Sequence, residues 1–220
     1  RLSYYPRMNQ RKNTDLLENK YRTYKKFKDM YKREVIRILK NEKPTEENLA
    51  KLREFAERHE NYVVKPVYAA FGNGVRVENL GMYDSVEEAH QEYSKSGAVI
   101  EEVIVQGEAL SKIHAGSVNT LRIPTAIIKN EEGEPEIKLF HPSIRMGRGD
   151  SFVDNFSAGG VSALIDAETG VIYTDGADKK GHTYECHPDS GIRVKGFQIP
   201  KWDEAVSMVK EAAMMIPDNH

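Results

Sequence analysis

The chain has 220 residues, of which 39% are hydrophobic and 30% charged, and its formal net charge is −2. This composition is typical of a globular protein of one large or two small domains, and the near-neutral charge argues against nucleic acid as a partner. No apolar stretch is long enough to span a membrane, and no segment has the pattern of a signal peptide. Because Cys186 is the only cysteine, no intrachain disulfide is possible, which fits a cytoplasmic protein.

The first quarter of the chain has the spacing of helices. Between residues 14 and 40 apolar side chains recur at mostly helical intervals, which predicts one or two helices. Thr45 has the residue type of an N-cap for a further helix that would bury Leu49, Leu52 and Phe55. We therefore expect a mainly helical N-terminal part.

The pattern then changes to that of strands. Residues 62–67 and 75–80 flank a glycine loop and predict a strand pair. Ser85 and Glu88 have the spacing of a capping box, which predicts a short helix to about Ser94. Further strands are predicted over residues 98–105, 120–129, 136–146, 160–166 and 171–175. With a final helix after Pro200, this order predicts an α+β fold with a largely antiparallel sheet of consecutive neighbours.

A lysine interrupts the first of these strands. Lys65 stands in an apolar run, and Gly72, Asn73 and Gly74 follow it. A lone strand lysine is most often an edge or solvent-facing residue. Glycines, however, let a backbone approach an anion, and a lysine beside them neutralises phosphate. The spacing matches neither a P-loop nor a dinucleotide-binding fingerprint, so these residues alone leave both interpretations open.

Acidic residues end the strand predicted over residues 98–105. Glu101 and Glu102 are either exposed alternates of that strand or carboxylates that contact an adenine amine or a ribose. In the second case, the backbone at Val103 would pair with the adenine ring. The residues alone favour the first interpretation.

Two arginines lie on strands that follow one another in the chain. Arg122 and Arg145 could face one another across a cleft, where their guanidinium groups would suit carboxylate or phosphate oxygens. The alternative is a pair of surface salt bridges, which stabilise a fold by roughly 0–1 kcal/mol.

Two polar loops complete the candidates. Asp154 and Asn155 precede a Gly-Gly pair, which is either turn chemistry or a place for a Mg²⁺ ligand and a substrate contact. His182, Cys186 and His187 are potential zinc ligands, but their spacing fits none of the usual structural motifs. We favour a structured turn at this loop.

Taken in order, these clusters resemble the ATP-grasp superfamily, and within it the sugar-transfer-associated group near teichuronopeptide-type and glutamate-ligase-like members. The resemblance runs from about Lys20 to the C-terminus. It rests on the segments VVKPVYAAFGNGV, EEVIVQ, SVNTLRIPT, RMGRGDSFVDNFSAGGV and HPDSG followed by IPKW. It implies an ATP-grasp fold with a helical N-terminal segment (1–60), a small lobe (61–105) and a large lobe (106–220).

The resemblance also implies roles for the candidate residues. Two lysines would hold the ATP phosphates, the glycine loop would close over them, the acidic strand end would receive the adenine, and a further glutamate would contact the ribose. These nucleotide-binding residues would be Lys20, Lys65, Gly72, Asn73, Gly74, Glu101, Glu102, Val103 and Glu108. Residues near the γ-phosphate and the acceptor would be Asn119, Arg122 and Arg145. Asp154 and Asn155 would lie on the stretch leading to the metal and substrate.

The implied activity is that of an ATP- and Mg²⁺-dependent ligase. A carboxylate would attack the γ-phosphate, and an amine or a related nucleophile would displace phosphate from the acylphosphate. The substrates would be small-molecule, sugar or peptide carboxylates and amines, in cell-envelope polysaccharide or peptide modification. The alternatives are an ATP-grasp kinase and a non-catalytic nucleotide-binding module. The family's last metal-binding strands, with a Glu-x-Asn motif, would follow His220, so we expect a longer natural protein.

Overall fold

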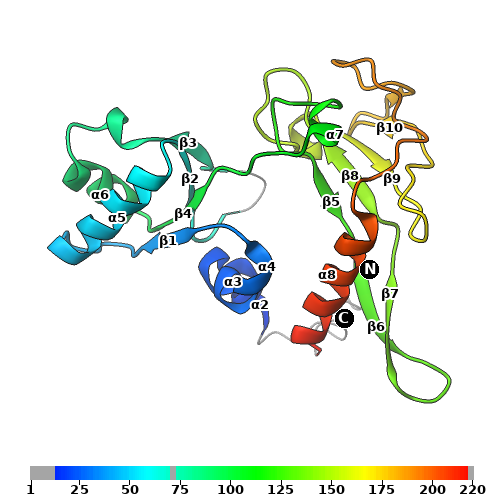
Figure 1. Ribbon diagram of the computed structural model, residues 1–220, viewed down its shortest axis with the longest axis horizontal. Coiled ribbons are helices and arrows are strands. Elements are labelled where there is room, and N and C mark those ends of the chain that lie inside the picture. Colours follow the sequence, from blue (N-terminus) through cyan, green and yellow to red (C-terminus); the bar gives the residue numbers. More distant parts are fainter. Residues whose placement is uncertain (1–12, 70–72, 218–220) are drawn as a thin grey trace. The chain divides into compact units, whose positions relative to one another are not determined.

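A computed structural model describes residues 13–69 and 73–217. These residues form two compact units, one of residues 14–104 and one of residues 105–217 with Asn13. Each unit has its own antiparallel sheet (Figure 1). Each also has its own buried core. Every helix in the described ranges is too short or too polar to cross a lipid bilayer.

The unit of residues 14–104 is built on a four-stranded sheet in the order β1-β4-β2-β3. Its strands are β1 (Val35–Ile38), β2 (Tyr62–Pro66), β3 (Arg76–Glu78) and β4 (Ala98–Glu102). Its helices are α2 (Thr14–Glu18), α3 (Lys20–Lys26), α4 (Lys28–Tyr31), α5 (Glu46–Arg58), the 3-10 helix η2 (Leu80–Met82) and α6 (Val86–Ser94). Because β4 lies between β1 and β2, this sheet is not a row of consecutive neighbours.

Helices cover both faces of this sheet, because side chains alternate along each strand. On one face, Val64 and Ile100 pack with Phe55 of α5 and Tyr93 of α6 in a buried core. On the other face, Val99 belongs to a smaller cluster that tyrosines of α3 and α4 extend. Figure 1 shows α5 and α6 side by side over the sheet.

The helix starts follow their predicted caps. The Thr45 hydroxyl accepts a hydrogen bond from the Asn48 amide, and the Asn48 side chain accepts one from the Thr45 amide. The Ser85 hydroxyl likewise accepts from the Glu88 amide, while the Glu88 carboxylate accepts from the Asp84 amide. Both predicted helices are confirmed, since these side chains satisfy the amides that the first turn of a helix leaves without partners.

The unit of residues 105–217 contains a five-stranded sheet in the order β11-β10-β9-β8-β5 and a two-stranded ribbon, β6-β7. The strands are β5 (Thr120–Arg122), β6 (Thr125–Lys129), β7 (Pro135–Leu139), β8 (Ser143–Met146), β9 (Val161–Leu164), β10 (Gly176–Ala177) and β11 (Thr183–Tyr184). The helices are α7 (Glu108–Ser111), the 3-10 helix η3 (Phe156–Ala158) and α8 (Trp202–Met215).

One face of the five-stranded sheet forms the core of this unit. Ile144 and Met146 of β8 pair with Ala163 and Val161 of β9, and all four side chains are buried. Trp202, at the start of α8, belongs to the same cluster. The opposite face is therefore left for the polar side chains of β5, β8 and β9.

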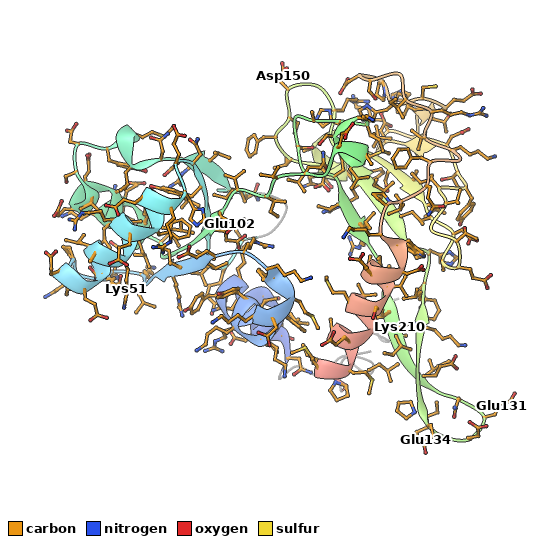
Figure 2. All side chains as sticks on the ribbon, viewed as in Figure 1. Lys51, Glu102, Glu131, Glu134, Asp150 and Lys210 are labelled. Atoms are coloured by element: carbon orange, nitrogen blue, oxygen red, sulfur yellow. The ribbon has the colours of Figure 1, made fainter. Side chains whose placement is uncertain are left out.

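The predicted strands over residues 120–129 and 136–146 each break in two. Pro124 separates β5 from β6, and a turn with His141 at φ 43° separates β7 from β8. The Phe140 amide donates to the Pro124 carbonyl at 2.9 Å, so the two strand segments stay paired across the break. The predicted hairpin of β6 and β7 is confirmed, and Glu131 and Glu134 mark its turn in Figure 2.

Three other sequence predictions were wrong in part. Residues 35–38 form a strand rather than part of a helix, because Val35 and Ile38 are buried and the segment pairs with β4. The strand predicted over 98–105 ends at Glu102. Residues 171–175 form no strand, although an isolated bridge joins Ile172 to Ile165.

Candidate functional site

In the unit of residues 14–104, Lys65 shares a sheet face with a buried glutamate. The Lys65 Nζ donates to Glu101 Oε2 at 2.7 Å, and the Arg33 Nε donates to the same oxygen at 3.0 Å. Glu101 is 4% exposed, so burial strengthens both ion pairs. One carboxylate thus holds two cations in place.

Lys20 brings a third cation to this group. Its side chain donates to the Ala69 carbonyl at 2.7 Å, and its amide donates to the Val67 carbonyl at 3.2 Å. Burial lowers the pKa of Lys20, the charge of Lys65 lowers it further, and Glu101 partly offsets both effects. The two ammonium groups are therefore close enough to repel each other.

The group has more positive than negative charge. Lys20, Lys65 and Arg33 surround the single carboxylate of Glu101, and the Arg33 guanidinium lies 4.2 Å from the centre of the Tyr31 ring. Burial, and then Glu101, raise the pKa of Tyr31, so its hydroxyl stays neutral. An anion with several oxygens would balance the surplus charge of the lysines, and this donor set fits a polyphosphate.

The glycine loop is described only in part. Gly72 lies outside the described residues, and Asn73 is an exposed turn residue. Gly74 has φ +71°, and a Cβ there would lie 2.8 Å from the Pro66 side chain. Glycine is thus required where the loop returns past the end of the lysine strand.

Glu101 and Glu102, which were predicted to contact the adenine or the ribose, point to opposite faces of the sheet. Glu102 points to the sheet face opposite Glu101, as neighbouring strand residues must, and its carboxylate accepts from the Glu34 amide at 2.9 Å. Val103 follows the end of β4 and is 37% exposed. Glu108, in the other unit, is exposed on α7 and pairs with Lys112 at 2.9 Å. Their nucleotide-binding roles stay predictions.

In the unit of residues 105–217, two arginines share the polar face of the five-stranded sheet. Arg145 pairs in register with Thr120, and Arg122 pairs with Ser143, so the two arginines lie diagonally across β5 and β8. The register places both arginines on one face of adjacent strands, whereas the prediction that they face one another across a cleft stays a prediction. Arg122 is exposed, whereas Arg145 is partly buried.

Arg145 is held by a polar network. Its guanidinium donates to the Thr120 hydroxyl at 2.9 Å and lies 3.5 Å from an Asp154 oxygen. The Thr120 amide donates to Asp154 at 3.1 Å, and the Thr120 hydroxyl also donates to this carboxylate. Because Asp154 is 8% exposed, Arg145 and Thr120 supply the partners that a buried carboxylate needs.

The loop after Asp154 is closely packed. The Asn155 side chain accepts from the Ser157 amide and caps η3. A Cβ at Gly160 would lie 2.6 Å from the Asp154 carbonyl and 2.9 Å from that of Met146. Asp154 offers a hard oxygen ligand, but its role in metal binding, and that of Asn155, stay predictions.

Asn119 has a structural position. Its side chain donates to the carbonyls of Leu110 at 2.9 Å and His114 at 3.0 Å, and accepts from the Gly147 amide at 3.2 Å. The side chain thus ties the loops around α7 and β8 together. The prediction that it lies near the γ-phosphate is not tested by these contacts.

Sequence reasoning missed Arg33 and Thr120. Arg33 lies in a stretch that was predicted to be helical, although three of the four residues at 35–38 are β-branched and could have indicated a strand. Thr120 lies two residues before Arg122, and alternation along a strand places both on one face. The partner of each cation could not be predicted, because it depends on the strand pairing.

Comparison with known proteins gave two kinds of result. The family model described as "Sugar-transfer associated ATP-grasp" matches residues 1–219. A comparison with curated proteins gave no match. Among solved structures, D-cycloserine synthetase DcsG is 12% identical with a TM-score of 0.41 over 90% of this chain, and D-alanyl-alanine synthetase A from Vibrio cholerae is 9% identical with a TM-score of 0.40 over 90%.

A third similar structure is N5-carboxyaminoimidazole synthetase from Staphylococcus aureus complexed with ADP. It is 15% identical, with a TM-score of 0.38 over 84% of this chain. The present chain spans 70%, 66% and 53% of the lengths of these three proteins, in the order given.

Proposed function

Because the chain belongs to the sugar-transfer associated ATP-grasp family, we propose that it is part of an ATP- and Mg²⁺-dependent ligase. In this proposal a carboxylate is activated by transfer of the γ-phosphoryl group of ATP, and an amine then displaces phosphate from the acylphosphate. Phosphoryl transfer requires positioned charges rather than a protein nucleophile. The chemistry therefore suits a site made of lysines and arginines.

The observation that carries this proposal is the surplus of positive charge around Glu101. Lys20 and Lys65 would bind the phosphates, and Arg33 would remain paired with the glutamate when they do. The lowered pKa of Lys20, caused by burial and then by Lys65, marks a repulsion that a bound phosphate would relieve. Glu101 would act by positioning the Lys65 ammonium, which it contacts at 2.7 Å.

The arginines of the other unit would serve the acceptor. Arg122 is exposed and would be available to a substrate carboxylate or phosphate, whereas Arg145 is fixed by Thr120 and Asp154. Mg²⁺, when bound, would neutralise charge on the phosphate oxygens. Asp154 is the described residue that we propose as an oxygen ligand, and it would have to exchange its contact with Arg145 for the ion.

The family description supports a proposal for the substrate class. We propose that a sugar- or peptide-linked carboxylate and an amine are joined during polysaccharide or peptide modification of the cell envelope. This rests on the words "sugar-transfer associated" and on the guanidinium groups, which suit acidic substrates.

Hydroxylamine trapping tests the proposal. The full-length gene product is incubated with ATP, Mg²⁺, hydroxylamine and a panel of sugar and peptide carboxylates. A ligase gives a hydroxamate together with ADP, because hydroxylamine intercepts an acylphosphate. ADP with a phosphorylated alcohol and no hydroxamate would indicate a kinase instead, and nucleotide binding without ADP formation would indicate a non-catalytic module.

A further inference from the structure

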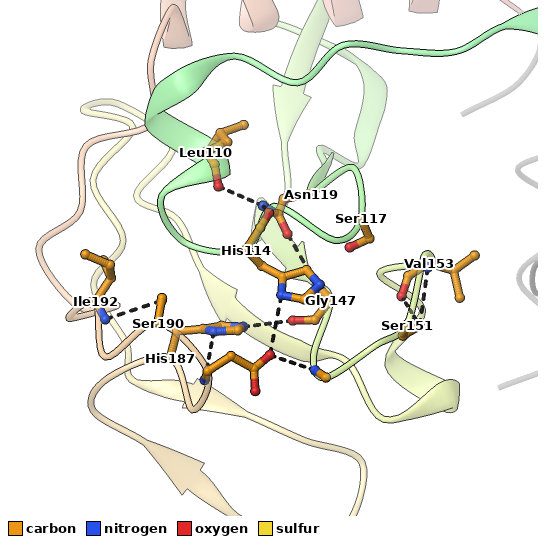
Figure 3. Close-up of polar contacts among 12 residues, drawn as sticks. Leu110, His114, Ser117, Asn119, Gly147, Ser151, Val153, His187, Ser190 and Ile192 are labelled. Atoms are coloured by element: carbon orange, nitrogen blue, oxygen red, sulfur yellow. Dashed lines mark hydrogen bonds and ion pairs between the residues drawn. The ribbon is translucent and has the colours of Figure 1, made fainter. Parts of the chain in front are cut away.

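Two histidines and an aspartate meet outside the groups discussed so far. His114 follows α7, and His187 and Asp189 belong to a tight turn before the last helix. One potential ligand atom from each residue lies within 4.8 Å of the other two. Figure 3 shows the His114 and His187 rings close together, and their centres are 5.6 Å apart. His114 is 7% exposed and His187 is fully buried.

We propose that His114, His187 and Asp189 form a binding site for a divalent transition metal such as Zn²⁺. Imidazole nitrogens suit Zn²⁺ and related ions, whereas Mg²⁺ prefers oxygen ligands. This site is thus different from the Mg²⁺ that an ATP-dependent reaction would use.

The tautomer of His187 is fixed by a backbone carbonyl. Its Nε2 lies 2.8 Å from the Gly147 carbonyl, which can only accept, so Nε2 carries the proton and Nδ1 carries the lone pair. That lone pair accepts a long hydrogen bond from the Asp189 amide at 3.4 Å, which a metal ion on Nδ1 would replace. A backbone carbonyl that fixes the second nitrogen is a common feature of metal-binding histidines.

His114 and Asp189 are already at ligand spacing. The distance from His114 Nδ1 to Asp189 Oδ2 is 3.4 Å. Two ligands of a tetrahedral zinc ion, with bonds of about 2.0–2.1 Å, are about 3.3 Å apart. The Gly149 amide donates to the same aspartate oxygen at 2.7 Å and orients the carboxylate. Asp189 is 37% exposed, so a small rotation could bring it to the ion, and water could fill a remaining position.

Two buried polar atoms beside the cluster have no hydrogen-bond partner among the described residues. His114 Nε2 and Ser117 Oγ are buried without a hydrogen-bond partner, and both lie close to Gly147, at 2.8 and 2.1 Å from the position of a Cβ there. A metal on Nδ1 would fix the His114 proton on Nε2, on the side of the ring that faces Gly147.

The site would tie together the loop after α7, the loop after β8 and the turn of residues 187–191. The turn is held by its own hydrogen bonds, from the His187 amide to Ile192 at 2.7 Å and from the Gly191 amide to His187 at 2.8 Å. Because β8 carries Arg145, the ion would stabilise the end of the strand that presents this arginine.

Metal titration without nucleotide tests the site. The chelator-treated protein should bind about one Zn²⁺ per chain and gain thermal stability, and Co²⁺ should give a visible absorption band typical of nitrogen ligands. Mg²⁺ alone should do neither. Asp189→Asn and His114→Gln should each weaken Zn²⁺ binding at least roughly tenfold. His141→Asn, a substitution of an exposed histidine, is the matched control and should bind as the wild type does.

Two results would overturn the proposal. One is a wild-type chain that shows neither the Co²⁺ band nor a zinc-dependent rise in melting temperature, which would make the cluster an ordinary ion pair. The other is a set of folded variants, Asp189→Asn and His114→Gln, that bind Zn²⁺ as tightly as His141→Asn. Far-ultraviolet circular dichroism of each variant without metal verifies its fold.

Discussion

The two charged sheet faces of this protein differ in how their cations are balanced. On the four-stranded sheet, Lys65 and Arg33 share the buried carboxylate of Glu101, and Lys20 adds a further positive charge. On the five-stranded sheet, Arg145 has its own carboxylate, Asp154. The first face therefore has positive charge to spare for an anionic ligand, whereas the second is already neutral around Arg145. Basic residues on a sheet face can therefore either be neutralised by their own carboxylate, as Arg145 is, or be left with charge for a ligand, as Lys20 and Lys65 are.

Replacing Lys65 gives the largest expected difference between the faces. In Lys65→Ala, ATP affinity should fall by roughly 10- to 100-fold, the equivalent of a lost charge-assisted hydrogen bond of about 1.5–3 kcal/mol. The fold should remain, because Arg33 still pairs with Glu101. Calorimetric titration of the full-length protein measures the affinity. Lys51→Ala, on the exposed side of α5, is the control, and an equal loss in both variants would contradict the assignment.

On the second face, the backbone of the loop after Asp154 should tolerate an added side chain poorly. Gly160→Ala should lower the free energy of unfolding by roughly 1–3 kcal/mol, because the new methyl group meets three backbone carbonyls that cannot rotate away. Urea denaturation measures this. Gly107→Ala, where a Cβ meets nothing within 4 Å, should unfold like the wild type. Equal stability of the two variants would show that the loop is looser than described.

Removing each arginine separates structural from available charge. Arg145→Ala should cost about 1–2 kcal/mol of stability, since Asp154 loses a cation while Thr120 keeps donating to it. Arg122→Ala should change stability by less than about 0.5 kcal/mol, because its side chain is exposed. Thermal unfolding of both variants tests this order. If Arg122→Ala were the more destabilising of the two, the assignment of Arg145 as the structural arginine would be wrong.

The charge of Lys20 should give the smallest effect, seen as a pH dependence. Its pKa lies below the ordinary value of 10.5, and bound phosphate would raise it again. ATP affinity is then complete while free Lys20 is protonated and falls as pH rises through the pKa of the free state. In Lys20→Arg, whose guanidinium does not lose its proton, this loss should begin at higher pH. ATP-binding curves from neutral pH to pH 10.5 measure the shift. Identical curves for the wild type and Lys20→Arg would show that Lys20 does not bind the ATP phosphates.

Local signals predicted most elements, and long-range pairing decided the rest. Thr45 and Ser85 were correct as helix caps because capping depends on neighbouring residues only. Residues 35–38 were assigned to a helix because their pairing with β4 lies far along the chain. The same limit applied to the site. Lys65 was singled out from its place in a strand, but its partner Glu101, and Arg33, which shares that carboxylate, meet it only after the sheet has formed.

The cluster of His114, His187 and Asp189 was the feature least predictable from the sequence. His187 was considered together with His182 and Cys186, which are near in sequence, but the structure places it beside His114 and Asp189. His182 instead lies 2.9 Å from Asp178, and Cys186 is exposed. Spacing along the chain reveals ligands only when they share one loop or helix.

The broken strands around Pro124 have a practical consequence for engineering. Because the Phe140 amide still reaches the Pro124 carbonyl, the five-stranded sheet and the β6-β7 ribbon are joined by a paired segment. Side chains alternate along both arms of the ribbon, so removing one residue from a single arm would reverse every outward and inward side chain beyond it. Removing two consecutive residues from β6 together with the two residues of β7 that face them would shorten the ribbon and keep that alternation. The ribbon is thus a segment whose length can be tuned in steps of two pairs while the strands that carry Arg122 and Arg145 keep their register.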